Sequence, residues 1–190
     1  LRGCLRDTAG AQGRLAFLAG ESGIGKTSIV RRFMEQSMEA GCRRVRIGHC
    51  VEQSGPAEPF LPVLDALGQL CRTEAAMVEV LRRSAPSWLL QLPALLDDAE
   101  IAALHRRIVG ASKDRMLREM SDALPELAAD APLVLVLEDL HWSDASTLEL
   151  LKSLARRGVP GGLLIIGTYR TPLSGAPASP VDELALELQA

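Results

Sequence analysis

A short segment near the start of the sequence, residues 20–28, combines glycines, a lysine and hydroxyl side chains. Its letters GESGIGKT at 20–27 fit the phosphate-binding pattern GxxxxGK[ST]. Glycines allow the backbone to curl until successive N–H groups point inward at a phosphate, and a following helix adds its positive N-terminal end. Lys26 can then reach the β- and γ-phosphates of a nucleotide, and the Thr27 hydroxyl can bind Mg²⁺. The predicted nucleotide-binding residues are Gly20, Glu21, Ser22, Gly23, Ile24, Gly25, Lys26, Thr27 and Ser28.

Two other interpretations of these glycines are weaker. A dinucleotide-binding fingerprint GxGxxG could use Gly23 and Gly25, but Ser28 stands where its third glycine should be. A glycine-rich turn with a solvated lysine would not need the apolar run before it or the helical pattern after it. The phosphate-binding loop therefore fits the sequence best.

Two consecutive carboxylates, Glu138 and Asp139, follow the apolar run Leu133–Leu137. Such a run is typical of a strand that is buried on both faces of a parallel sheet, and ligands bind outside the carboxyl ends of such strands. Adjacent strand residues point in opposite directions. We expect Glu138 to hold Mg²⁺ through its water shell and Asp139 to orient or deprotonate an attacking water. The alternative is that both acids merely begin a turn before a helix.

The elements that must position these residues alternate between strand and helix. Short apolar or alternating runs predict strands at Leu15–Ala19, Arg43–Cys50, Leu133–Leu137 and Leu163–Thr168. Helical spacing follows Gly25 and covers 144–157, where Asp144 begins a helix and Gly158 stops it. Between Pro59 and Asp130 leucines recur at spacings of three and four, with Pro62, Pro86, Pro93 and Pro125 near expected helix starts. The pattern predicts an α/β fold with helical crossovers.

The composition excludes several classes of protein. The chain has 190 residues, of which 47% are hydrophobic, and this is enough for one globular domain. Its formal charge of −3 lacks the basic footprint of a nucleic-acid binder, and we expect the cluster Arg43, Arg44 and Arg46 to be a solvated strand end. The apolar runs are far shorter than the ~20 residues that span a bilayer, and the start resembles no signal peptide. We expect a cytoplasmic protein without membrane contact.

The four cysteines do not form a metal or disulfide pattern. Cys4, Cys42, Cys50 and Cys71 have no CxxC spacing, and a chain of this size needs no disulfide framework. A zinc site from Cys42, His49 and Cys50 would lack a second pair of ligands. We expect buried or free thiols.

Three segments together resemble a known family. GESGIGKTS at 20–28, LVLEDLHWSDASTLELL at 135–151 and LLIIGTYR at 163–170 are similar to the AAA-type ATPase domain of signal-transduction ATPases with numerous domains (STAND), as in large ATP-binding LuxR-type regulators. The resemblance implies a three-layer P-loop NTPase sandwich whose parallel sheet has strand order 1-4-3-2. It makes 1–190 one ATPase domain fragment with a helical insertion at 50–131, a linker at 171–180, and the fifth strand and lid missing.

The resemblance also assigns roles to individual residues. It implies that Thr168, at the tip of the sensor strand, faces the γ-phosphate and that Arg170 reports on it, as a catalytic residue together with Lys26 and Asp139. The alternative for Arg170 is a surface arginine that opens a loop. His141 and Trp142 belong to the resembling phrase, and we expect Trp142 to be a packing anchor. Many relatives place Asp before Glu, so the order Glu138–Asp139 predicts slow hydrolysis.

The resulting functional hypothesis is an ATP- and Mg²⁺-binding, slowly hydrolysing switch module of a multidomain bacterial signalling or transcriptional regulator. Its expected partners are ATP or ADP, its own C-terminal domains and further copies of itself, with no direct nucleic-acid contact. A small-molecule or nucleoside kinase is an alternative, with Arg106, Arg107, Arg115 and Arg118 as weak candidates for its lid. A nucleotide-holding oligomerisation scaffold is the other.

Overall fold

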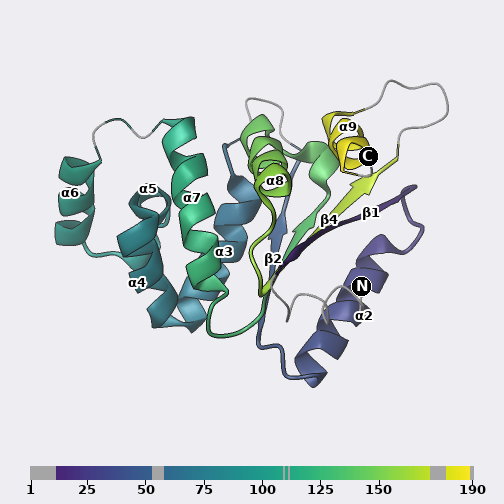
Figure 1. Ribbon diagram of the computed structural model, residues 1–190, viewed down its shortest axis with the longest axis horizontal. Helices are drawn as coiled ribbons and strands as arrows, with labels where there is room; N and C mark the ends of the chain where they lie inside the picture. The colour runs from purple at the N-terminus through teal and green to yellow at the C-terminus, as the bar shows by residue number, and fades with distance from the viewer. Residues whose placement is uncertain (1–11, 53–57, 109, 111, 172–178, 189–190) are drawn as a thin grey trace.

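The computed structural model describes residues 12–52, 58–108, 110, 112–171 and 179–188, shown as a coloured ribbon in Figure 1. These residues form strands, α-helices and two short 3-10 helices. In chain order the elements are β1 (Arg14–Gly20), α2 (Lys26–Glu39), β2 (Arg44–His49), α3 (Leu61–Thr73), α4 (Ala75–Ser84), α5 (Pro86–Leu90), η1 (Pro93–Leu95), α6 (Asp98–Arg107), α7 (Lys113–Leu127), β3 (Leu133–Glu138), η2 (Leu140–Trp142), α8 (Ala145–Arg157), β4 (Leu163–Arg170) and α9 (Pro180–Glu187).

The four strands form one parallel sheet in the order β1-β4-β3-β2. This confirms the predicted α/β fold and its strand order. The register places Gly20 opposite Arg170 and His49 opposite Glu138, so the carboxyl ends of the four strands lie along one edge of the sheet. Residues far apart in the sequence are thereby brought together at that edge.

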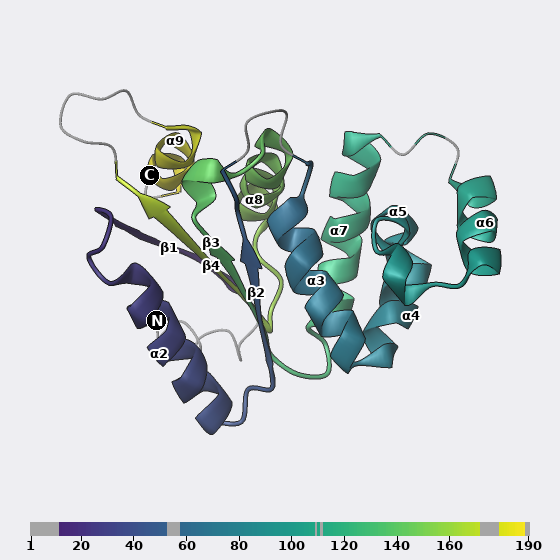
Figure 2. The same ribbon diagram turned by 180° about the vertical axis from the view of Figure 1, so that it is seen from behind.

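Helices cover both faces of the sheet, and Figure 2 shows α2 on one side of the strands with α3, α7 and α8 on the other. The buried side chains of β3 alternate between these layers, as expected for a central strand. Val134 and Val136 pack with Val30 and Phe33 of α2. Leu133, Leu135 and Leu137 join the core beneath the other helices. The result is a three-layer sandwich.

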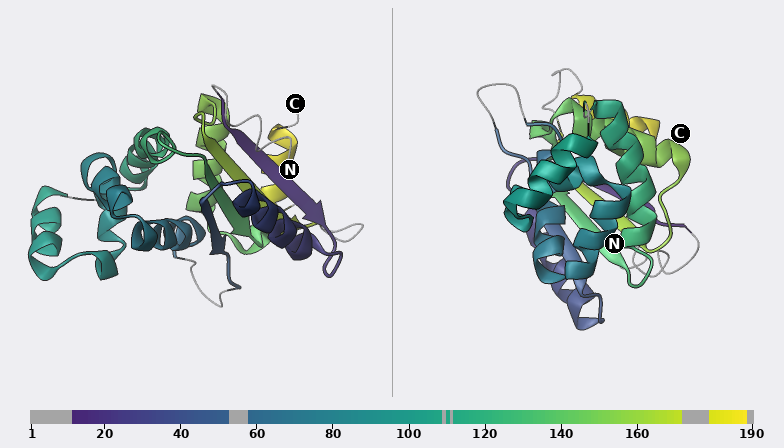
Figure 3. Two further views of the ribbon diagram at one scale, coloured as in Figure 1. Left: turned by 90° about the horizontal axis from the view of Figure 1, so that it is seen from below. Right: turned by 90° about the vertical axis from the view of Figure 1, so that its left-hand side faces the viewer.

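Helix α3 lies very close to β2 because Gly48 has no side chain. A Cβ atom at position 48 would stand 1.7 Å from the carbonyl oxygen of Pro62, in the first turn of α3. The helices from α4 to α7 extend away from the sheet, as the left view of Figure 3 shows. They enclose Trp88, which is fully buried and donates from Nε1 to the Met116 carbonyl at 2.8 Å.

Most of the predicted helix signals are confirmed, and one is wrong. Pro62, Pro86 and Pro93 lie at the starts of helices. Pro125 instead lies inside α7, near its end. A proline there removes one backbone donor. The buried side chains around it, among them Leu124 and Leu127, keep the last turn packed against the core.

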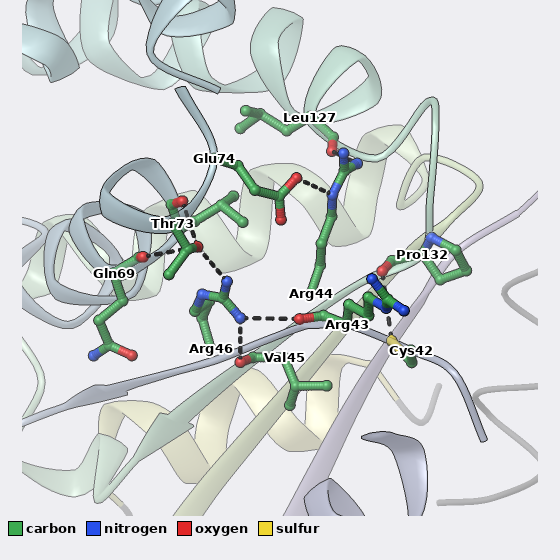
Figure 4. A network of polar contacts seen from close by, with 11 residues as sticks. Cys42, Arg43, Arg44, Val45, Arg46, Gln69, Thr73, Glu74, Leu127 and Pro132 are labelled. Atoms are coloured by element: carbon green, nitrogen blue, oxygen red, sulfur yellow. Dashed lines mark hydrogen bonds and ion pairs between the residues drawn. The ribbon is translucent and has the colours of Figure 1, made fainter. Parts of the chain in front are cut away.

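The arginine cluster at the start of β2 is a second correction, because it is not simply a solvated strand end. The Arg44 side chain is only 11% exposed, and its Nε donates to Glu74 Oε2 at 2.8 Å. Its Nη1 donates to the Leu127 carbonyl, while Arg46 donates to the Thr73 hydroxyl (Figure 4). Arg43 is exposed. This arginine network joins β2 to the α3–α4 junction and to α7.

Other sequence expectations fall partly inside the described residues. Cys42, Cys50 and Cys71 are free and buried, and burial raises the pKa of Cys50 to about 12; Cys4 lies outside the described residues. Most of the predicted linker, 172–178, also lies outside them, whereas Ser179 caps α9. Within the described ranges, none of the helices is both long enough and apolar enough to pass through a bilayer.

Candidate nucleotide-binding site

The loop between β1 and α2 has the backbone geometry that the glycines predicted. Gly23 and Gly25 have φ angles of 79° and 99°, a region that L side chains rarely adopt, and Gly25 caps α2. Lys26 is buried in the first turn, where its Nζ donates to the carbonyls of Gly20 and Glu21 at 2.8 and 2.9 Å. The ammonium group therefore stands directly beside the curled loop.

A cavity of about 300 Å³ opens in front of this loop at the carboxyl edge of the sheet. It brings together side chains from three parts of the chain: the loop with the start of α2, the residue after β3, and the end of β4. Its lining residues are Ser22, Gly23, Gly25, Lys26, Thr27, Ser28, Asp139 and Arg170. The predicted residues Gly20, Glu21, Ile24, Glu138 and Thr168 are not part of this lining, and Ile24 points outward with 67% of its surface exposed.

The two carboxylates at the end of β3 have different surroundings. Glu138 is buried; its Oε1 has no hydrogen-bond partner among the described residues, and its Oε2 lies 3.6 Å from His49 Nε2. The Asp139 side chain is 45% exposed and faces the cavity. Asp139 also has a left-handed backbone, with φ 59° and ψ 44°. The two acids are thus suited to different tasks.

His49 is a neighbour of this site that the sequence analysis missed. It ends β2, and its Nδ1 lies 3.5 Å from Asp65 Oδ2 of α3 while its Nε2 faces Glu138. One signal could have revealed it. The predicted strand order already makes the second and third strands neighbours, so the last residues of both must meet at one edge.

His141 and Trp142 follow the acid pair in η2. The ring nitrogens of His141 are buried without hydrogen-bond partners among the described residues, and its Nδ1 is 3.9 Å from Asp139 Oδ1. Burial lowers the pKa of His141, as do the charges of Lys26 and Arg170, whereas Asp139 raises it. Trp142, the expected packing anchor, is 37% exposed, and its ring centroid lies 5.0 Å from that of His141.

The end of β4 contributes Thr168 and Arg170. Arg170 reaches the cavity. Thr168 is only 2% exposed, and its hydroxyl oxygen accepts a hydrogen bond from the Asp139 backbone N–H at 3.1 Å. The next residue, Thr171, donates its backbone N–H to the Gly20 carbonyl. The end of β4 is therefore bonded both to the acid pair and to the start of the phosphate-binding loop.

A parallel sheet in this order, with a glycine-rich loop between β1 and α2 and acids after β3, defines the class of P-loop NTPases. Residues 1–166 match the model of the family described as "AAA ATPase domain". Because the match covers most of the chain, the protein belongs to this family. It is an AAA-type domain, a nucleotide-binding module.

The chain is similar in sequence to a curated bacterial protein. The chain is 25% identical over 174 residues to "Uncharacterized protein R02095" of Rhizobium meliloti (strain 1021). The match covers 84% of this chain but only 16% of the relative. The chain therefore spans about a sixth of the length of that relative.

Proposed function

We propose that this domain binds Mg·ATP in the cavity in front of the β1–α2 loop and hydrolyses it slowly. The observation that carries the proposal is the convergence of three side chains on one cavity: Lys26 from the start of α2, Asp139 from just after β3 and Arg170 from the end of β4. A cation from the phosphate loop, a carboxylate and a second cation are the groups that phosphoryl transfer to water requires. The absence of a guanine-reading NKxD-type motif and the resemblance to ATP-dependent regulators favour ATP.

The residues present fit a nucleotide with its metal ion. The backbone at Gly23 and Gly25 leaves open space where side chains would otherwise stand, so the loop can receive phosphate oxygens. Lys26 would bind the β- and γ-phosphates, and the Thr27 hydroxyl would bind Mg²⁺. Glu138 Oε1, which is buried and has no hydrogen-bond partner within the described part of the chain, would accept from the water shell of the ion. The ion would neutralise charge that develops on the phosphates.

Turnover depends on the carboxylate that orients water. Asp139 faces the cavity and would orient or deprotonate the attacking water, while Arg170 would bind the γ-phosphate. The Asp139 side chain is one methylene shorter than that of a glutamate at the same position. It reaches less far toward the water, and we therefore propose a slow ATPase that acts as a switch.

We further propose that the switch belongs to a multidomain bacterial signalling or transcriptional regulator of the STAND type. The EDLHWSD phrase at 138–144 supports this, as does a bacterial relative that is several times longer than the chain. The output would be read by other domains of the same protein or by further copies of it.

The kinase alternative receives less support from the site. Arg115 is bonded to Glu119 and Arg107 donates to the Arg82 carbonyl. In the part of the chain that the structure describes, none of the four candidate lid arginines lines the cavity. A scaffold that holds nucleotide without turnover differs from our proposal only in the rate of hydrolysis.

Calorimetric titration and phosphate release test the proposal. The chain should bind Mg·ATP and release phosphate at a measurable rate without an added acceptor. Lys26→Ala should bind about ten- to a hundred-fold more weakly, since a charge-assisted hydrogen bond contributes ~1.5–3 kcal/mol. Lys113→Ala is the matched control because Lys113 lies on α7 and is half exposed. Equal affinities of the wild type and Lys26→Ala would contradict the assignment.

A further inference from the structure

The backbone of Asp139 requires a specific support. Asp139 is one of two non-glycine residues with positive φ among the described residues. The left-handed conformation is disfavoured for any residue with a side chain, although aspartate tolerates it better than most. Such a residue keeps this conformation only where its surroundings fix it. The conformation matters, because it turns the carboxylate out of the strand and into the cavity.

The Thr168 side chain supplies this support. The β3–β4 ladder ends at the pair Leu137 and Gly167, two residues before Asp139. Beyond that point the Asp139 N–H is bonded to the hydroxyl oxygen of Thr168 at 3.1 Å, so a side chain replaces the backbone acceptor of the ladder. Thr168 is buried and β-branched, and its hydroxyl position is therefore narrowly defined.

The surrounding contacts favour the same turn. Leu140 lies over Gly167, where a Cβ atom would stand 2.4 Å from the Leu140 Cδ1. The Trp142 N–H donates to the Asp139 carbonyl at 2.8 Å. Asp139 is thus bonded through its N–H to β4 and through its carbonyl to η2. The Thr168 bond is the one that a single conservative substitution can remove.

We propose that Thr168 is a positioning residue that acts through Asp139, a role that rests on the proposed ATPase function. The resemblance implies a direct contact of this residue with the γ-phosphate. The geometry points elsewhere, because the hydroxyl is bonded to the Asp139 backbone and Thr168 is not among the residues that line the cavity. Thr168 fixes the direction of the Asp139 carboxylate, and this carboxylate orients the attacking water.

Amide hydrogen exchange tests the support independently of activity. Exchange of the Asp139 N–H should be slow in the wild type and in Thr168→Ser, which keeps the hydroxyl. It should be at least about tenfold faster in Thr168→Val, which keeps the shape and loses the acceptor. Thr147→Val is the matched control, since Thr147 is also buried and its hydroxyl donates to Asp144 Oδ2 at 2.5 Å. Unchanged protection of Asp139 in Thr168→Val overturns the proposal.

Kinetics then separate positioning from phosphate contact. Thr168→Val should lower kcat at least about tenfold, because a misplacement of ~1 Å can cost ~10²-fold, while the ratio of ATP to ADP affinity stays constant. In the Asp139→Asn background the same change should have no further effect on kcat. A selective loss of ATP affinity, or additive losses in the double variant, would establish direct phosphate contact instead. A wild type that neither binds nor hydrolyses ATP would refute the proposed function, while amide exchange would still decide whether Thr168 holds Asp139.

Discussion

At the amino end of β2, the buried guanidinium of Arg44 donates to a carboxylate and to a backbone carbonyl. At the carboxyl end of the neighbouring β3, Glu138 Oε1 and the ring nitrogens of His141 are buried without hydrogen-bond partners among the described residues. Both regions contain charged or titratable side chains that the sheet edge and the helices take out of water. In the first region the buried polar atoms form hydrogen bonds with other groups of the chain. In the second region, buried polar atoms lack such partners among the described residues.

This difference separates a structural role from a functional one. A satisfied buried network stabilises the fold as it stands, whereas each unsatisfied buried polar group costs about 1–3 kcal/mol. Because such groups lie at one edge, beside the phosphate-binding loop, we expect them to serve binding or catalysis. Substitutions at the amino end of β2 should therefore lower the stability of the protein, and substitutions at the carboxyl end of β3 should lower its activity.

The largest expected effect is on turnover, from Asp139→Asn. The amide cannot accept a proton from water, and a general base typically contributes about 10²–10⁴-fold. ATP affinity should stay within about threefold, because orientation of water acts mainly in the transition state. Phosphate release under saturating ATP measures the loss. Asp130→Asn, an exposed aspartate just before β3, should behave as the wild type. If Asp139→Asn hydrolysed ATP at the wild-type rate, the proposed catalytic role of the carboxyl end of β3 would be wrong.

The next effect is on stability, from Arg44→Met at the other end of the sheet. The variant leaves the partly exposed Glu74 and the Leu127 carbonyl without their donor, and loss of hydrogen bonds from a charged group costs about 1.5–3 kcal/mol. Urea denaturation measures the change. Arg43→Met is the control, because Arg43 is exposed. The comparison fails if both variants unfold at the same urea concentration, or if Arg44→Met loses ATP affinity while it remains folded.

A smaller effect is expected from Glu138→Gln. Removal of the carboxylate should weaken the dependence of ATP binding on Mg²⁺ by about ten- to a hundred-fold, the usual range for residues around a metal ion. Stability should not fall, since the variant removes a buried charge whose Oε1 has no hydrogen-bond partner in the ranges that the structure describes. Titration of ATP at several Mg²⁺ concentrations gives the answer. A variant that is strongly destabilised and binds Mg·ATP normally would make Glu138 a structural residue.

The smallest effect concerns pH. Burial lowers the pKa of His141 in the folded state, so the unfolded state takes up its proton first as the pH falls. The free energy of unfolding should therefore decrease as the pH falls through the unfolded value of ~6.5 and level off below the folded pKa. His141→Gln should lack this component, whereas His105→Gln, an exposed position on α6, should keep it. Denaturation curves measured between pH 8 and 5 give the free energy of unfolding at each pH. If this free energy changed with pH in the same way in the wild type and in His141→Gln, the prediction would be wrong. The nearby carboxylates of Asp139 and Glu52 raise the pKa of His141, and the cations of Arg170 and Lys26 lower it.

The sequence predicts the sheet and the phosphate-binding loop well because both depend on local signals. The apolar run before Glu138 is typical of a buried strand, and the positive φ angles at Gly23 and Gly25 favour glycine. The strand order 1-4-3-2, which brings Lys26 and Asp139 to the same edge of the sheet, is instead implied by the family resemblance. The strands and the phosphate-binding loop are thus each determined by a few consecutive residues.

The errors concern residues whose surroundings come from distant helices. The burial of Arg44 depends on how α4 and α7 pack beside β2, and no local spacing encodes that. Pro125 ends up within α7 because tertiary packing outweighs its local preference. The contact of Thr168 with the Asp139 backbone depends on a turn that period-two alternation does not predict. The spacing of residues locates the site, whereas the hydrogen-bond partners of those residues depend on tertiary packing.

The close approach of Gly48 to Pro62 also restricts how the molecule can move. Because backbone packs against backbone here, with no side chain between them that could rotate, we expect β2 and α3 to move together. His49 follows Gly48 directly, and Asp65 lies one turn further along α3. A displacement of α3 would therefore carry with it both His49, which lies beside the Glu138 carboxylate, and Asp65, which lies on the other side of the His49 ring.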